Sequence, residues 1–200
     1  DHVPDGAPEQ NKRLASAGIA HTDVEVKIFD SLDNELPAGE TGQIVTRSDL
    51  VMKGYWRNPD ATAETLRNGW LHTGDVGYLD QYGYLFLMDR SKDMIISGGE
   101  NIYPREIEEV IIQHPAVCEV AIIGIPDLDW GEAIKAVVAV VPGQAVTEAQ
   151  VIEFCKQHIA SYKKPKSVDF VDELPKNNYG KIVKRKLRDK YWEGKSSKVI

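Results

Sequence analysis

The stretch DRSKDMIISGGENIYP, residues 89–104, is the most informative segment of the sequence. It opens with closely spaced charges and continues as a short apolar run that predicts a strand. It then reaches a Gly98-Gly99 turn, before Pro104 at a position that suits the first turn of a helix. Glycines let a backbone approach a ligand closely, so one interpretation is a hinge followed by a phosphate-binding loop. The other is a β-hairpin turn among solvated charges, and two glycines alone do not decide between them.

On its N-terminal side, the stretch is preceded by short strands separated by turns. Apolar and polar residues alternate at positions 24–28, and Gly, Asn and Asp residues punctuate the runs that follow. Short strands at turn-rich spacing favour a small distorted barrel or a meander. The expected elements are strands around 24–28 and over 42–46, 70–79 and 84–87, with a short helix over 60–66.

On its C-terminal side, the pattern changes to a βαββαβ-like order. About 110 residues of this pattern can fold alone, so we place a domain boundary at Asp89–Lys92, between domains 1–89 and 90–200. The predicted class is α+β: a distorted β-barrel or meander followed by a compact α+β domain. The expected elements here are strands over 94–97, 117–124 and 134–141, helices over 104–113 and 147–159, and a final strand.

Composition limits the classes of function. The 200 residues are 42% hydrophobic with a net charge of −7, and residues 156–200 hold 13 Lys and Arg against 5 Asp and Glu. Such a basic segment attracts a polyphosphate, whereas nucleic acid is disfavoured because aromatic residues are not interleaved with the charges. We expect no membrane span and no signal peptide, hence the cytoplasm. Cys118 and Cys155 are predicted as buried thiols rather than metal ligands.

Two further segments can carry chemistry. GWLHTGD, residues 69–75, places Asp75 on a small-residue turn, where a carboxylate can accept hydrogen bonds from vicinal hydroxyls such as those of a ribose. Taken alone, an Asp that satisfies its own turn is the favoured alternative, and His72 is interpreted as a structural neighbour. LPKNNYGK, residues 174–181, presents Lys181 on a loop where it could reach a phosphate or remain a solvated lysine. Neither segment is a GxxxxGK[ST] or GxGxxG loop.

In this order, the three segments together resemble the acyl-adenylate-forming superfamily over nearly the whole chain. GENIYPREIE, residues 99–108, is similar to the AMP-forming acyl-CoA ligases, whereas amino-acid-activating domains usually carry Gly-x-Arg-Ile-Glu at this point. The resemblance implies the end of a large domain followed by a mobile C-terminal lid. It also implies a ligase that converts a carboxylic acid to acyl-AMP and then to acyl-CoA, with release of pyrophosphate and AMP.

The resemblance also implies roles for individual residues. Asp75 and Arg90 would bind the ribose of ATP or acyl-AMP, and Lys181 would be the catalytic contact of the α-phosphate and the substrate carboxylate. Lys92 would be the hinge about which the lid turns. Gly98 and Gly99 would line the pantetheine path of coenzyme A. Other coenzyme A contacts would be Trp130, Tyr162, Lys164 and Lys166.

Some family segments are missing from these 200 residues. They are the glycine-rich Ser/Thr loop, the Tyr-Gly-x-Thr-Glu segment with its magnesium-binding glutamate, and the acyl pocket. We therefore expect a C-terminal part of a ligase that is inactive alone, whose partners are its N-terminal portion, the acid, ATP and coenzyme A. Magnesium would be bound upstream, with no metal ligand here; the acid and homo-oligomerisation stay open. The alternatives are another adenylate-former, luciferase-like or amino-acid-activating, and a non-catalytic module that binds nucleotide or coenzyme A.

Overall fold

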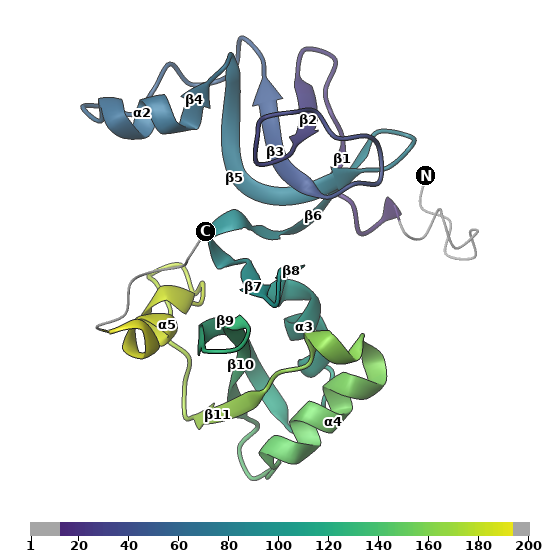
Figure 1. Cartoon of the computed structure of the whole chain (residues 1–200), viewed down its shortest axis with the longest axis vertical. Coiled ribbons are helices and arrows are strands. Elements are labelled where there is room, and N and C mark those ends of the chain that lie inside the picture. The colour runs from purple at the N-terminus through teal and green to yellow at the C-terminus, as the bar shows by residue number, and fades with distance from the viewer. Residues whose placement is uncertain (1–12, 194–200) are drawn as a thin grey trace. The chain divides into compact units, whose positions relative to one another are not determined.

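The structure is a computed structural model that describes residues 13–193. The chain divides between Lys92 and Asp93 into two compact units, which we call unit 1 and unit 2 (Figure 1). A 3₁₀ turn, η1 (Ser91–Asp93), spans this division. The sequence-predicted boundary at Asp89–Lys92 ends at the same residue.

Unit 1 contains a six-stranded sheet with antiparallel pairing throughout. The strand order is β1-β6-β5-β3-β2, and β4 pairs with β5 beside this path. In the described part of the chain the sheet does not close into a barrel, so of the two predicted forms the open meander is the one observed. Its elements are β1 (Gly18–Ile19), β2 (Glu25–Phe29), β3 (Gly42–Arg47), α2 (Pro59–Thr65), β4 (Leu66–Arg67), β5 (Trp70–Leu79) and β6 (Tyr84–Arg90).

Strand β5 is strongly curved, as Figure 1 shows. Its pairing shifts register against β3 between Gln43 and Val45 and against β6 between Val76 and Gly77. A Cβ at Gly77 would lie 2.3 Å from the Phe86 carbonyl oxygen, so only glycine permits this close approach of two backbones. Asp75 lies in the middle of β5, next to the register shift at Val76, and such irregularities bend a strand and increase its twist locally.

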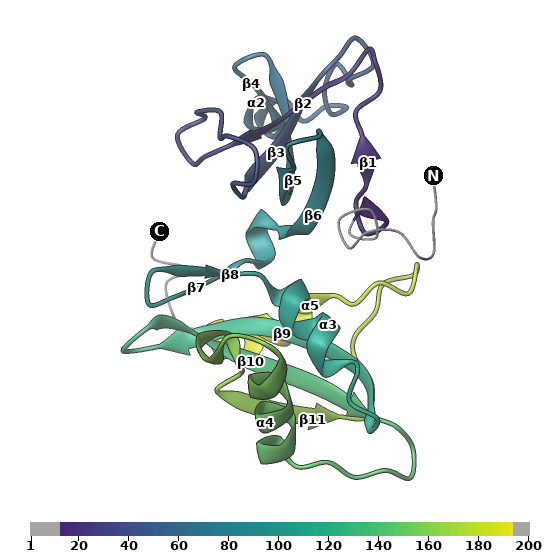
Figure 2. The same cartoon turned by 90° about the vertical axis from the view of Figure 1, so that its right-hand side faces the viewer.

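Unit 2 contains a five-stranded sheet that carries three helices. The long strands β9 and β10 are antiparallel and β11 runs parallel to β10, while β7 and β8 form a hairpin that is attached to β10 (Figure 2). The elements are β7 (Ile95–Ser97), β8 (Glu100–Ile102), α3 (Pro104–Ile111), β9 (Val117–Asp127), β10 (Gly131–Val140), α4 (Glu148–His158), η2 (Ser161–Lys163), β11 (Ser167–Val171) and α5 (Lys184–Trp192).

Both faces of the unit 2 sheet are covered by helices. Alternate strand residues such as Ile122 pack with residues of α3 and α4, while their neighbours such as Ile123 pack with Leu187 of α5. Figure 2 shows α3 and α4 in front of β9 and β10 and α5 behind them. A strand that is buried on both faces is apolar at consecutive positions, which explains the long apolar runs of β9 and β10.

The predicted α+β class is confirmed, and most predicted elements are present. The predicted capping box of Thr147 and Gln150 forms at the start of α4. Helix α5 was not predicted, because Leu187 is its one buried residue and its sequence is mostly charged. Cys155 is buried as expected, whereas the prediction for Cys118 is wrong: it follows the buried Val117 on β9 but its own side chain is exposed. Within residues 13–193, no helix is long and apolar enough to cross a membrane.

Candidate functional site

Asp75 and Arg90 lie directly opposite each other on β5 and β6. Arg90 Nε is 3.5 Å from Asp75 Oδ1, and the two side chains are 49% and 42% exposed. The pair therefore forms an accessible carboxylate with a guanidinium beside it. A hydroxyl-bearing ligand could donate to the carboxylate and accept from the guanidinium at the same place.

The backbone around Asp75 is held by neighbouring hydroxyls. Thr73 Oγ1 donates to the Ile44 carbonyl at 2.8 Å and accepts from the Asp75 amide at 3.1 Å. Ser91 Oγ donates to the Gly74 carbonyl at 3.2 Å, and Gly74 has φ +75°, the left-handed region. Asp75 thus does not satisfy its own turn with its side chain; Thr73 does this, and the carboxylate faces Arg90 instead.

His72 is a buried structural residue, as the sequence suggested. Its Nδ1 lies 2.8 Å from Gln43 Oε1, and its ring makes an edge contact with Phe29 at a centroid distance of 6.4 Å. Burial lowers the pKa of the imidazole below its ordinary value. Nε2 is buried without a hydrogen-bond partner in the described part of the chain. No nucleophile is placed beside it there.

Lys92 is exposed and is the last residue of unit 1, in the middle of the η1 turn. Its placement at the division between the two units is what a hinge position requires.

Lys181 lies at the end of a tight loop in unit 2. The loop closes through an isolated β-bridge between Lys176 and Ile182. The Asn177 side chain organises it: Oδ1 accepts from the Tyr179 and Lys181 amides, both at 3.0 Å. Gly180 takes φ +78° and donates to the Asn177 carbonyl at 2.9 Å. These contacts hold the loop backbone in one conformation, and Lys181 on it is exposed.

The lysines that flank this loop are neutralised by carboxylates. Lys176 pairs with Glu119 on β9, and Lys184 Nζ is 2.8 Å from Glu108 Oε1 on α3. These pairs anchor the two ends of the loop to unit 2. Within residues 13–193, no carboxylate lies within ion-pair distance of the Lys181 ammonium, which leaves its charge available to an anionic ligand.

Gly98 and Gly99 form the two-residue turn of the β7–β8 hairpin, with φ +61° and +86°. Both positive angles are typical of the turn that matches the twist of two paired strands. Trp130 packs against this turn: a Cβ at Gly98 would lie 2.5 Å from the indole ring, and the Gly98 amide donates to the Trp130 carbonyl at 2.9 Å. The Gly98–Gly99 segment is thus a β-hairpin turn, and the group that approaches its backbone closely is the Trp130 ring.

Lys166 joins Trp130 from the other side. Its Nζ is 5.3 Å from the centroid of the indole ring and 3.1 Å from Asp127 Oδ2. The hydrogen bond from Lys166 lowers the pKa of the Asp127 carboxyl. Tyr162 and Lys164 belong to the η2 region, where Lys164 Nζ donates to the Ser161 carbonyl at 2.9 Å. Of the predicted coenzyme A contacts, the structure brings together Gly98, Trp130 and Lys166.

Sequence reasoning did not single out two residues that shape these sites. Asn177 orders the Lys181 loop, and its signal is an Asn two and four residues before the amides that it caps. Glu132 is buried beside the glycine hairpin, and its signal is a charge at the start of a strand whose one other charged residue is Lys135.

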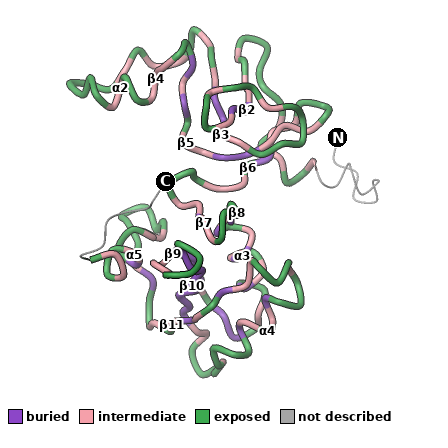
Figure 3. Tube along the Cα trace, in the orientation of Figure 1, coloured by how far each residue is buried: buried purple, intermediate pink, exposed green. Residues whose placement is uncertain are grey.

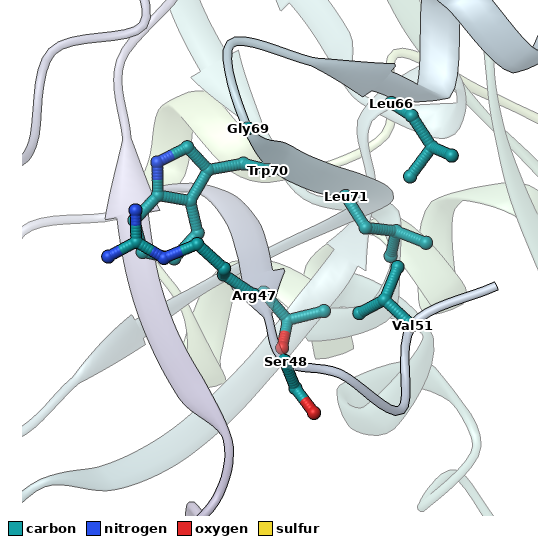
Figure 4. Close-up of a pocket in the computed structure, with 8 residues that line it drawn as sticks. Arg47, Ser48, Val51, Leu66, Gly69, Trp70 and Leu71 are labelled. Atoms are coloured by element: carbon teal, nitrogen blue, oxygen red, sulfur yellow. The ribbon is translucent and has the colours of Figure 1, made fainter. Parts of the chain in front are cut away.

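A separate pocket of about 210 Å³ lies in unit 1, away from the predicted residues. Figure 4 shows Arg47 stacked on Trp70 at one end, with Val51, Leu66 and Leu71 at the other. Arg47 is held by Glu25 through two hydrogen bonds, so its charge is already satisfied. In residues 13–193, no group of three or more His, Cys, Asp or Glu side chains is arranged to hold a metal ion.

Comparison with known proteins matches both parts of the chain to one family. Residues 2–56 match the sequence model of the AMP-binding enzymes, and residues 106–181 match that of the AMP-binding enzyme C-terminal domain. A long-chain-fatty-acid–CoA ligase of Escherichia coli O6:H1 is 48% identical over 174 residues, which are 87% of this chain and 31% of that protein.

A fatty acid–[acyl-carrier-protein] ligase of Streptomyces coeruleorubidus is 43% identical over 99% of this chain and 37% of its own length. Among solved structures, o-succinylbenzoate CoA synthetase from Bacillus subtilis, in complex with its acyl-adenylate intermediate, superposes with a TM-score of 0.83. It is 38% identical, over 92% of this chain and 37% of that one. The chain thus spans about a third of the length of these relatives, and it belongs to the family of AMP-binding, acyl-adenylate-forming enzymes.

Proposed function

We propose that this chain is part of an ATP-dependent acyl-CoA ligase, which converts a carboxylic acid to acyl-AMP and then to acyl-CoA. The observation that carries the proposal is the accessible Asp75–Arg90 pair on adjacent strands, with side chains 3.5 Å apart. Asp75 accepts hydrogen bonds from the two ribose hydroxyls of ATP or acyl-AMP, and Arg90 supports the same sugar. The substrates are ATP, coenzyme A and a carboxylic acid, and the similarity to a long-chain-fatty-acid–CoA ligase favours a fatty acid.

Lys181 acts in the first half-reaction. A substrate carboxylate oxygen attacks the α-phosphorus of ATP, a new P–O bond forms, and the bond to pyrophosphate breaks. Negative charge is spread over the transferring phosphoryl group, so a fixed cation stabilises this transition state more than a protein nucleophile would. Lys181 can supply that cation, because its loop is held by Asn177 and its ammonium has no carboxylate within ion-pair distance in the described part of the chain. Magnesium, held by residues of the longer polypeptide, would add positive charge at the phosphates.

In the second half-reaction the coenzyme A thiol attacks the acyl carbonyl of acyl-AMP, and AMP leaves. The Gly98–Gly99 turn, flanked by Trp130 and Lys166, lines the path of the pantetheine arm, while Tyr162 and Lys164 contribute to coenzyme A binding. A lysine placed over the phosphate would obstruct this path. Unit 2 therefore presents Lys181 in one step and the glycine turn in the other, by rotation about Lys92.

The test uses a longer polypeptide, in which this chain is joined to the part of its relatives' length that it does not cover. Lys181→Ala is expected to slow adenylation by about 10² to 10³, measured as ATP–pyrophosphate exchange, because one preorganised charge is lost. Thioester formation from supplied acyl-adenylate should persist. Lys156→Ala, which removes an exposed lysine of α4 that pairs with Glu153, is the matched control. Equal losses in both half-reactions would contradict the division of labour.

A carrier protein is the second candidate acceptor, because a relative that spans 99% of this chain is named as an acyl-carrier-protein ligase. Supplying the acyl-adenylate with either coenzyme A or an acyl-carrier protein separates the two. Faster release of AMP with the carrier protein would assign the acceptor to that class.

A further inference from the structure

Glu132 is a buried carboxylate at the start of the central strand β10. Only 5% of the residue is exposed, and the strand that follows it is almost entirely apolar. Its Oε2 accepts a hydrogen bond from the Ile96 amide of β7 at 2.8 Å. Oε1 is buried and has no hydrogen-bond partner in the described part of the chain.

A half-satisfied buried carboxylate does little for the stability of a core. Burying a charged group costs free energy, and each unpaired polar atom adds to that cost. Local violations of this kind are expected where position matters more than stability. We therefore expect Glu132 to hold in place the group that it contacts, the Ile96 amide.

Gly124 on β9 makes the space for this carboxylate. A Cβ at Gly124 would lie 3.1 Å from both Oε2 and the carboxyl carbon of Glu132, closer than ordinary contacts allow. The Gly124 carbonyl accepts a hydrogen bond from Trp192 Nε1 at 3.1 Å, so the strand is also held from α5. The carboxylate is confined between two strands.

Ile95 and Ile102 of the β7–β8 hairpin pack in the same buried cluster as Ile134 of β10, but the backbone of the hairpin makes few other hydrogen bonds to that strand. The strand pairing consists of Gly131 opposite Ser97, and the Gly98 amide adds one hydrogen bond to Trp130. Ile96 lies just beyond this short ladder, and the Glu132 side chain there takes the place of a backbone partner. The apolar packing fixes the base of the hairpin, and the backbone position at the turn end depends in addition on the hydrogen bond from Ile96 to Glu132.

We propose that Glu132 is the positioning residue of the Gly98–Gly99 turn, which it holds against Trp130 through Ile96. The inference rests on the proposed function, in which this turn lines the pantetheine path during thioester formation. Glu132 does not contact the reacting atoms. It sets the position of the backbone that lines the pantetheine path.

The first test measures amide hydrogen exchange in the 200-residue chain. Glu132→Ala should speed exchange at Ile96 and Gly98 by about tenfold, the scale of one lost hydrogen bond, while Val137 in the β9–β10 ladder changes little. Glu132→Gln keeps an acceptor and should stay within about threefold of the native chain. Gly124→Ala should loosen the hairpin by displacing the carboxylate without removing it. Glu153→Ala, at an exposed Glu of α4, is the control.

The second test uses the same variants in the longer polypeptide. Glu132→Ala should raise KM for coenzyme A or lower kcat of thioester formation by about tenfold, with adenylation unchanged and with Glu132→Gln restoring most of the loss. Unchanged exchange at Ile96 overturns the inference whatever the enzyme does, and so does exchange that rises equally at Val137, because Glu132 is then a general core residue. Loosened exchange with unaltered thioester kinetics overturns instead the assignment of the turn to pantetheine.

Discussion

The two units bury their apolar residues to very different extents. Among residues 13–193, unit 2 has a cluster of thirteen buried residues on one sheet face and a second cluster under α5, whereas the cluster of unit 1 consists of Phe29, Val45 and Trp70 (Figure 3). Apolar burial is the main favourable term in folding, so unit 2 holds its sites on the more self-sufficient core. The Asp75–Arg90 pair of unit 1 depends instead on the register of two strands.

This difference fits the roles that we propose. A body that delivers Lys181 and the glycine turn in alternation must keep both in fixed internal positions, and a large core with covered sheet faces provides that rigidity. The ribose pair needs only a local strand geometry, which β5 and β6 supply. Three variants test this difference between the two units.

The largest expected effect is that of Ile107→Ala in unit 2. Ile107 is fully buried at the centre of the large cluster, and such truncations cost about 2–5 kcal/mol. Denaturant unfolding followed by amide exchange should show protection lost across β9 and β10 while β3 and β5 retain theirs. Equal loss in both units would mean that they unfold as one body, against the comparison.

A smaller effect is expected for Gly77→Ala in unit 1. The added methyl would meet the Phe86 carbonyl oxygen at 2.3 Å, so β5 and β6 must separate, at about 1–3 kcal/mol. The free energy of unfolding of unit 1 should fall, and AMP binding by the longer polypeptide should weaken because Asp75 and Arg90 lose their register. Gly143→Ala, in unit 2 and with no atom within 4 Å of the added Cβ, is the control for a glycine substitution that does not touch β5 and β6. AMP binding as tight as in the native polypeptide would show that the Asp75–Arg90 pair does not bind the nucleotide.

The smallest effect is a pH dependence confined to unit 1. Burial lowers the pKa of His72, so below its unfolded pKa of about 6.5 the unfolded state binds more protons than the folded state. The stability of unit 1 should therefore fall as the pH drops from about 6.5 towards 5, above the range where carboxylates titrate. His72→Gln should flatten this dependence in equilibrium unfolding, and an unchanged slope in the variant would remove His72 as its source.

Sequence reasoning predicted the structural features that depend on residues close together in the chain. The start of α3 at Pro104, the capping box at Thr147 and the turn at Gly98 each depend on residues a few positions apart. The mainly charged helix α5 was missed, since its packing against β9 leaves almost no periodic signal.

The candidate site divides in the same way. Its residues were named through a family resemblance, and what the sequence could not give was their contacts. The Asp75–Arg90 pairing depends on the register of β5 and β6, and the contact of Glu132 with Ile96 joins strands 36 residues apart. Such long-range contacts are set by the packing of whole elements rather than by neighbouring residues.

Whether Lys181 serves adenylation and the Gly98–Gly99 turn serves thioester formation is tested by measuring both half-reactions for two variants, Lys181→Ala and Gly98→Ala, in the longer polypeptide. Lys181→Ala should lose adenylation and retain thioester formation. Gly98→Ala should show the opposite pattern, because its methyl group would lie 2.5 Å from the Trp130 ring in a turn with φ +61°. Crossed losses of this kind are the predicted result. Equal losses of both half-reactions in both variants would show that Lys181 and the glycine turn do not serve separate steps.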